Sequence, residues 1–133
     1  MRESKWKTVV MRRYRSWEEL PDEEARGDAR IALDLFPGWS PAWEELLMPP
    51  REVAVEGGFG LQEVRDSWLA YAGWSLIRRI KEQGIQTHLV LAKGQLEGKH
   101  RLAAALYLNL CVVPVYRAIE DWPGTEVKEI GLE

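Results

Sequence analysis

The residues best suited to chemistry in this sequence are four neighbours, Gly98, Lys99, His100 and Arg101, which follow Glu97. The alanine- and leucine-rich stretch after them predicts a short helix. Cations in the first turn of a helix are unfavourable because the helix dipole already places about half a positive charge there. They become favourable when an anion binds, since the free backbone N–H groups of that turn and the cations then act together. Gly98 also lets a ligand approach the backbone closely, so the stretch is typical of a phosphate-binding site.

Each of these residues also has a plainer interpretation. Glu97 could orient the loop or hold a metal together with a nucleotide, but a carboxylate near free N–H groups is more often a cap. Arg101 could pair with an internal carboxylate such as Glu97, and its loss would then lower stability and leave anion binding unchanged. His100 is interpreted as a ligand contact rather than a core residue, whereas His88, in a predicted strand, is more typical of a packed or surface histidine.

A general base for phosphoryl chemistry would be a carboxylate that faces the four-residue stretch. The candidates for a catalytic role are Glu97, Glu63 and Asp66, and Glu52 and Glu56 belong to the same acidic group ahead of the long predicted helix. The sequence contains no HExxH, no paired CxxC and no other spaced metal-binding set, so it predicts no structural metal.

The elements that must position these residues follow from hydrophobic periodicity and from the glycines and prolines between the periodic segments. We expect a strand within residues 6–15, helices over 21–35 and 40–48, a short strand over 53–55, a helix over 61–83, a strand over 85–92, a helix over 100–108 and a strand over 112–116.

Three single residues near the last helix carry further expectations. Asn109 lies where the chain leaves that helix, and Asn is second only to Gly in left-handed geometry, so we expect a positive φ there. Pro114 cannot donate to a ladder, which predicts an edge strand or a bulge. Cys111 has apolar neighbours, which indicates a buried thiol, and one cysteine cannot form an internal disulfide.

Composition limits the possible classes of protein. The chain of 133 residues suits one domain, and its net charge of −3 gives no general attraction to nucleic acid, so such a contact would need a local basic patch. No apolar run is long enough for a membrane span and none resembles a signal peptide, so we expect a cytoplasmic protein. The seven tryptophans are interpreted as packing anchors rather than as a platform for stacking bases.

The stretch LEGKHRLAAALYLNLCVVPVY resembles the motif of the ParB/sulfiredoxin superfamily, in which an acidic residue, Gly, two polar residues and Arg precede a small-residue helix and a Val-Pro strand. The preceding SLIRRIKEQGIQTHLVL is similar to that superfamily's helix and Gln-led strand, so the resemblance covers residues 68–117. It implies a compact α/β (α+β) fold with a small mixed sheet, and we expect a single domain over residues 1–133 in which 61–120 form the core. Residues 1–60 do not match the superfamily and are interpreted as a helical N-terminal extension or cap over the site.

The resemblance also implies a function. By position, Gly98, Lys99, His100 and Arg101 would contact a nucleotide or polyphosphate, such as CTP or ATP with Mg²⁺. The superfamily includes CTP-binding partition clamps, sulfinic acid reductases, free-serine kinases and nucleases. The reductases carry a reactive Cys where this chain has Lys99, so that activity is not expected, and the DNA-reading domain of partition proteins does not fit the residues after Arg117.

Three hypotheses remain open at this point. The first is a small ParB-like protein that binds a nucleotide or phosphoester and transfers or hydrolyses its phosphate. The second is a non-catalytic module that holds DNA phosphate or a partner's phosphate, and the third is a domain retained for contact with other proteins. The sequence does not fix the oligomeric state or the substrate.

Overall fold

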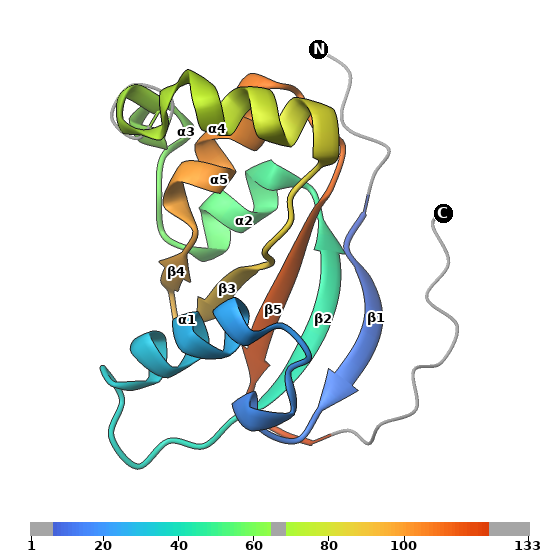
Figure 1. Ribbon diagram of the computed structural model, residues 1–133. Coiled ribbons are helices and arrows are strands. Elements are labelled where there is room, and N and C mark those ends of the chain that lie inside the picture. The colour runs from blue at the N-terminus through green and yellow to red at the C-terminus, as the bar shows by residue number, and fades with distance from the viewer. Residues whose placement is uncertain (1–6, 65–68, 123–133) are drawn as a thin grey trace.

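A computed structural model describes residues 7–64 and 69–122 of the chain (Figure 1). This part of the chain forms five strands, five α-helices and one 3-10 turn. In chain order they are β1 (Val9–Tyr14), η1 (Trp17–Glu19), α1 (Glu23–Leu33), β2 (Ala42–Met48), α2 (Pro50–Glu56), α3 (Leu61–Glu63), α4 (Leu69–Gln83), β3 (Leu89–Ala92), β4 (Gln95–Glu97), α5 (Lys99–Tyr107) and β5 (Val113–Ile119).

The five strands form one mixed sheet in the order β1-β2-β5-β3-β4. All neighbouring pairs are antiparallel except β3 and β5, which run parallel. Parallel neighbours need a crossover, and here β4 and α5 provide it. The expectation of an α/β protein with a small mixed sheet is therefore confirmed. The crossover also places the first residue of α5 directly after the edge strand β4.

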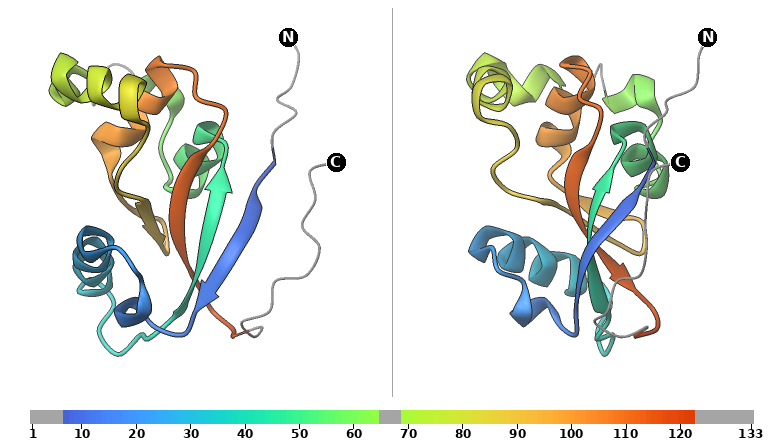
Figure 2. Two further views of the ribbon diagram at one scale, coloured as in Figure 1. Left: turned by 45° about the vertical axis from the view of Figure 1, so that its right-hand side comes forward. Right: turned by 90° about the vertical axis from the view of Figure 1, so that its right-hand side faces the viewer.

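Helices cover both faces of the sheet (Figure 2). On one face, the small residues Ala25, Ala29 and Ala32 of α1 pack closely against Trp43 and Tyr116 of the strands. On the other face, α2 and α5 contribute side chains to a larger core with β2, β3 and β5. The amphipathic helix α4 packs on α5 through Ile77 and Ile80. The helix α5 therefore lies between the sheet and α4.

Two neighbouring elements differ from the expectation. Residues 42–48 form strand β2 rather than a helix, and residues 50–56 form helix α2 where a short strand over 53–55 was expected. The paired acids Glu44 and Glu45 are typical of a helical first turn, but in the sheet they lie on opposite faces and bind Arg13 and His88. In α2, Val53 and Ala54 are buried while Val55 is exposed, which is the helical pattern.

Residues 1–60 differ only in part from the expected helical extension or cap, since a strand was expected within residues 6–15 and β1 lies there. They contribute β1 and β2, and β2 pairs along its whole length with β5. The two parts of the chain thus share one sheet. Local pattern favoured helices in this region, but strand pairing with residues about 70 positions away determines its structure.

The expected helix over 61–83 is present as α3 and α4, with residues 65–68 outside the described part of the chain. Within α4, Gly73 has a φ of 77° and a ψ of 153°, so the regular helix begins again at Trp74. Only glycine adopts such a conformation readily. Gly73 therefore reorients the helix before the segment that packs on α5.

Around α5 the sequence predictions have mixed outcomes. Asn109 has a φ of 56°, so its left-handed geometry is confirmed. Pro114 is not on an edge strand, since β5 lies between β2 and β3, but the parallel ladder with β3 begins only at Val115. Cys111 is exposed rather than buried, because in this connection Leu110 and Val113 face the core instead.

Candidate functional site

The N-terminus of α5 lacks the features that usually stabilise a helix start. Gly98 is the N-cap residue, with a φ of 107° and a ψ of 32°, and it has no side chain to cap the helix. The first backbone hydrogen bond of the helix runs from Leu102 N–H to the Gly98 carbonyl, at 3.0 Å. The N–H groups of Lys99, His100 and Arg101 precede it, so they have no acceptor within the helix. No acidic residue lies in the first turn.

Glycine is required at position 98 for two reasons. Its positive φ is strained for any other residue. In addition, a Cβ atom there would lie 3.0 Å from Nη2 and 3.1 Å from Cζ of Arg101, and 3.1 Å from Cγ of Leu89. Gly98 therefore makes room for the Arg101 guanidinium, which folds back over it.

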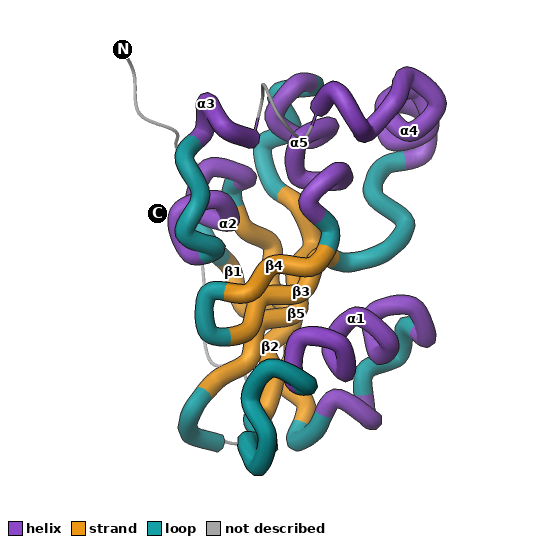
Figure 3. Tube along the Cα trace, turned by 90° about the vertical axis from the view of Figure 1, so that its left-hand side faces the viewer, coloured by secondary structure: helices purple, strands orange, loops and turns teal. Residues whose placement is uncertain are grey.

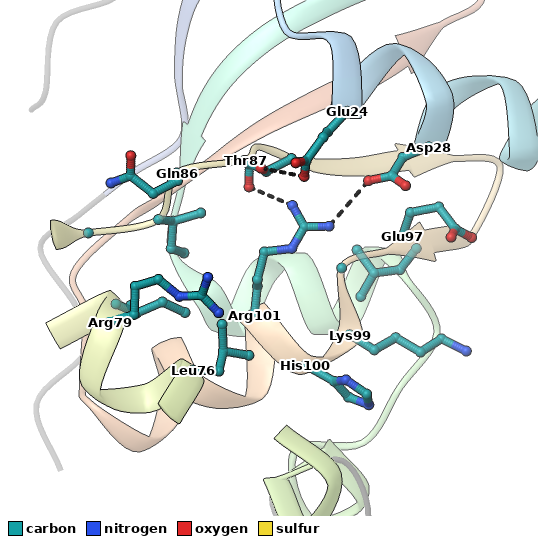
Figure 4. A pocket seen from close by; sticks show the side chains of 15 residues that line it. Glu24, Asp28, Leu76, Arg79, Gln86, Thr87, Glu97, Lys99, His100 and Arg101 are labelled. Atoms are coloured by element: carbon teal, nitrogen blue, oxygen red, sulfur yellow. Dashed lines mark hydrogen bonds and ion pairs between the residues drawn. The ribbon is translucent and has the colours of Figure 1, made fainter. Parts of the chain in front are cut away.

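The guanidinium of Arg101 is held by three contacts (Figure 4). Its Nη1 donates to the backbone carbonyls of Thr87 and His88, at 2.6 and 3.0 Å. Its Nη2 donates to Oδ2 of Asp28 on α1, at 3.2 Å. The internal carboxylate partner is thus Asp28, not Glu97. Because a guanidinium has five N–H donors, the Nε donor and one Nη2 donor remain after these bonds.

A pocket of about 590 Å³ opens at this helix end. Its walls come from α1, from the second half of α4, from the connection before β3, and from the β4–α5 junction. The lining residues are Glu24, Asp28, Leu76, Arg79, Ile80, Gly84, Ile85, Gln86, Thr87, Leu96, Glu97, Gly98, Lys99, His100 and Arg101. The four residues predicted to bind phosphate therefore line one pocket. Figure 3 shows how α1 and the α4–α5 pair lie on either side of the edge where β4 ends.

The charges in the pocket are of both signs. Lys99 and His100 are exposed, and their side chains point away from the Arg101 guanidinium (Figure 4). The Lys99 ammonium lies 5.3 Å from the centre of the Phe59 ring. Partial burial raises the pKa of Glu97 above its usual range, and the nearby carboxylate of Asp28 adds to this effect. Glu97 is thus a carboxylate that holds its proton more readily than usual.

The other candidate carboxylates that the structure describes do not line the pocket. Glu63 is exposed on α3, and Asp66 lies outside the described residues. Glu52 accepts a hydrogen bond from Thr8 at 2.7 Å, and Glu56 pairs with Arg117. Among the described carboxylates that the sequence suggested, Glu97 is therefore the one that lies at the four-residue stretch.

Three charged residues of the site were missed by sequence reasoning. Glu24 and Asp28 come from α1, where Glu24 accepts a hydrogen bond from the Thr87 hydroxyl at 3.0 Å. Arg79 comes from α4. The spacing of Glu24 and Asp28 puts both acids on one face of a helix, which was a usable signal. Nothing in the sequence indicated that this face meets residues more than 60 positions away.

His88 belongs to a separate cluster on the α1 face of the sheet. Its Nε2 lies 2.8 Å from Oε2 of Glu45, and its ring stacks on Tyr116 with centroids 4.3 Å apart. Tyr14 donates to the other oxygen of Glu45. Burial raises the pKa of Tyr116. These contacts agree with the interpretation of His88 as a packed residue.

The comparisons with known proteins provide no relative. No protein-family model matches this sequence, and neither the curated proteins nor the solved structures include a significant match. Within residues 7–64 and 69–122, no three side chains of the ligand types are grouped so that they could hold a metal ion. Over the same residues, no helix has the length and apolar character needed to cross a membrane.

Proposed function

We propose that this protein binds the phosphate groups of a nucleotide or another phosphoester in the pocket at the N-terminus of α5. The observation that carries the proposal is a helix end without a side-chain cap and with basic residues in its first turn, opening into a pocket of about 590 Å³. A helix end of this kind is unfavourable by itself and becomes favourable when an anion occupies it.

Several groups of the pocket would contact the phosphate oxygens. The N–H groups of the first turn, which have no acceptor within the helix, bind phosphate oxygens. Lys99 adds positive charge, and the His100 ring adds an N–H donor. Arg101 offers its two remaining donors while its other contacts keep it in place, so its side chain loses little freedom on binding. Arg79, on the opposite wall, supplies a second guanidinium. Guanidinium groups suit phosphate because they bind two oxygens at once.

A ParB/sulfiredoxin-like fold is part of the same proposal. Its support is the order helix, strand, turn, Gly-led helix and strand over residues 69–119, which agrees with the order that the resemblance implies. The resemblance points to CTP or ATP with Mg²⁺ as the ligand. Mg²⁺ is usually held by one or two carboxylates together with substrate phosphates, and the carboxylates of Glu24 and Asp28 line the pocket on its α1 side.

Phosphate transfer or hydrolysis would need a base, and our candidate is Glu97 because it lines the pocket. Its raised pKa makes it a stronger base than an ordinary carboxylate. Glu97→Gln is expected to abolish turnover of a nucleoside triphosphate and to leave binding largely intact. If the wild type consumes no triphosphate with any acceptor tested, the non-catalytic phosphate-binding module is the better description.

The binding proposal is tested by thermal shift and calorimetry. The ligands are CTP, ATP and GTP, their diphosphates, inorganic phosphate and sulfate, each with and without Mg²⁺. A ligand that binds the folded state raises the unfolding midpoint. Arg79→Ala removes a charge-assisted contact and is expected to weaken binding about ten- to a hundredfold. Arg51→Ala, on α2 and outside the pocket, is the matched control. The proposal fails if no phosphate compound shifts the midpoint, or if Arg79→Ala binds as the wild type does.

A further inference from the structure

Two aromatic side chains are exposed side by side at the surface of the helical layer. Trp74 on α4 is 67% exposed and Tyr107 on α5 is 48% exposed. Their rings touch edge to face, with centroids 5.7 Å apart. By contrast, Trp43 is completely buried. Single exposed apolar residues are ordinary, but adjacent large aromatics held on a rigid surface usually mark an interaction site.

The packing of the two helices holds this pair outward. Gly73 interrupts α4, so Trp74 begins its regular segment. Ile77 and Ile80 then pack against Ala104 of α5. These contacts use the facing sides of the two helices. Trp74 meets the last residue of α5, while Arg79 lies across the pocket from its first residues. The helices therefore run in opposite directions, and the aromatic pair lies at the end away from the pocket.

Basic residues accompany the aromatic pair. Trp74, Arg78 and Lys81 are spaced by four and three residues, which places them on one stripe of α4, and both cations are exposed. We call Trp74, Arg78, Lys81 and Tyr107 the α4–α5 surface. One acid, Glu82, borders this stripe. The local charge is thus positive although the whole chain has a net charge of −3.

We propose that the α4–α5 surface binds single-stranded nucleic acid, with unpaired bases on Trp74 and Tyr107 and backbone phosphates on Arg78 and Lys81. Sites for single strands combine a basic track with aromatic rings on which bases stack. Bases in a duplex are already stacked and paired, so exposed rings favour a single strand. The two rings and Arg78 would also suit a protein interface, where such residues are enriched, but lysine is depleted there, so Lys81 favours nucleic acid. This surface is separate from the phosphate pocket and does not depend on it.

The test measures binding of a labelled oligothymidine of twelve nucleotides by fluorescence anisotropy at low salt. Trp74→Ala is expected to weaken binding at least about fivefold, as loss of one stacked base does. Arg78→Glu and Lys81→Glu should weaken it as well and should reduce the dependence of affinity on salt, since each phosphate neutralised contributes about 0.7 to that slope. Arg51→Glu, an exposed arginine on α2, is the matched control for charge.

Three results would overturn the proposal. The first is no binding of the oligothymidine at 50 mM salt. The second is equal affinity of the wild type and Trp74→Ala. The third is tighter binding of a duplex of the same length, which would make the aromatic pair irrelevant. Nucleotide binding in the pocket is measured on the same variants and is expected to be unchanged, so failure of either proposal is distinguishable from failure of the other.

Discussion

The N-termini of α1 and α5 differ in how the backbone N–H groups of the first turn are satisfied. In α1, the Asp22 carboxylate accepts hydrogen bonds from the N–H groups of Glu24 and Ala25, at 2.9 and 3.4 Å, and Glu23 and Glu24 lie in the first turn. In α5, Gly98 offers no cap and the first turn is basic. At the first helix end, a side chain of the protein itself accepts hydrogen bonds from the N–H groups. At the second helix end no side chain caps the helix and no acidic residue lies in the first turn, which favours the binding of an anion there.

The two ends are also connected, because Asp28 of α1 pairs with Arg101 of α5. The first helix thus supplies a carboxylate that offsets some of the positive charge at the second. Substitutions at the two helix ends and at the contact between them are expected to change stability by different amounts, the largest at Arg101.

Arg101→Ala should have the largest effect on stability. It removes bonds to two carbonyls and leaves the Asp28 carboxylate, which is about three-quarters buried, without its partner. We expect a loss of about 2–3 kcal/mol in the free energy of unfolding, measured by urea denaturation. Asp28→Ala and the double variant complete the cycle. Additive losses would show that the pair does not couple the two helices.

Gly98→Ala should lower stability by about 2 kcal/mol, because the added Cβ is strained at positive φ and meets the Arg101 guanidinium. The matched variant lies in α1. Gly27 has no atom within 4 Å of its added Cβ, so Gly27→Ala should instead stabilise by about 0.5–1 kcal/mol through helix propensity. Equal effects of the two substitutions in thermal unfolding would contradict the geometry at Gly98.

Asp22→Ala removes the cap of α1 and should cost about 1 kcal/mol. Glu23→Ala, in the same turn, removes only a favourable interaction with the dipole and should cost no more than about 0.5 kcal/mol. Unfolding midpoints of the two variants measure the difference. A neutral Asp22→Ala would mean that α1 is no better capped than α5.

Glu97→Gln should give the smallest change, and the change depends on pH. The pKa of Glu97 is raised in the folded protein, so its ionised form opposes folding above that pKa. Below the ordinary carboxyl range the group is protonated in both states, and the cost disappears. Glu97→Gln should therefore raise the midpoint by a few degrees at most at pH 7 and leave it unchanged at pH 3. A lower midpoint at pH 7 would contradict the raised pKa.

How far the sequence predicted the structure depended on the range of the interactions. The turn at Gly98, helix α5 and the positive φ of Asn109 follow from short-range rules, and all are present. Strand β2 was predicted as a helix because Glu44 and Glu45 are typical of a helical first turn, while their partners Arg13 and His88 are distant in the sequence. Its assignment required knowledge of the sheet.

In the candidate site, too, contacts between sequence neighbours could be predicted and contacts between distant residues could not. Glu97 and the four residues after it are contiguous, so their meeting at one helix end could be predicted. Asp28 and Arg101 are 73 positions apart. Their pairing depends on how α1 crosses the sheet, through the small residues Ala25 and Ala29 that let it lie close to the strands. No local pattern contains that information.

The most direct test of the central claim is the substitution His100→Glu, studied with and without a phosphate ligand. This change places an acid in the first turn of α5, as in α1, at an exposed position. Without ligand, the midpoint should rise, corresponding to about 0.3–1 kcal/mol from the dipole. With ATP or inorganic pyrophosphate, the midpoint shift seen in the wild type should be lost. A variant that is less stable without ligand and still shows the full ligand shift would contradict the account.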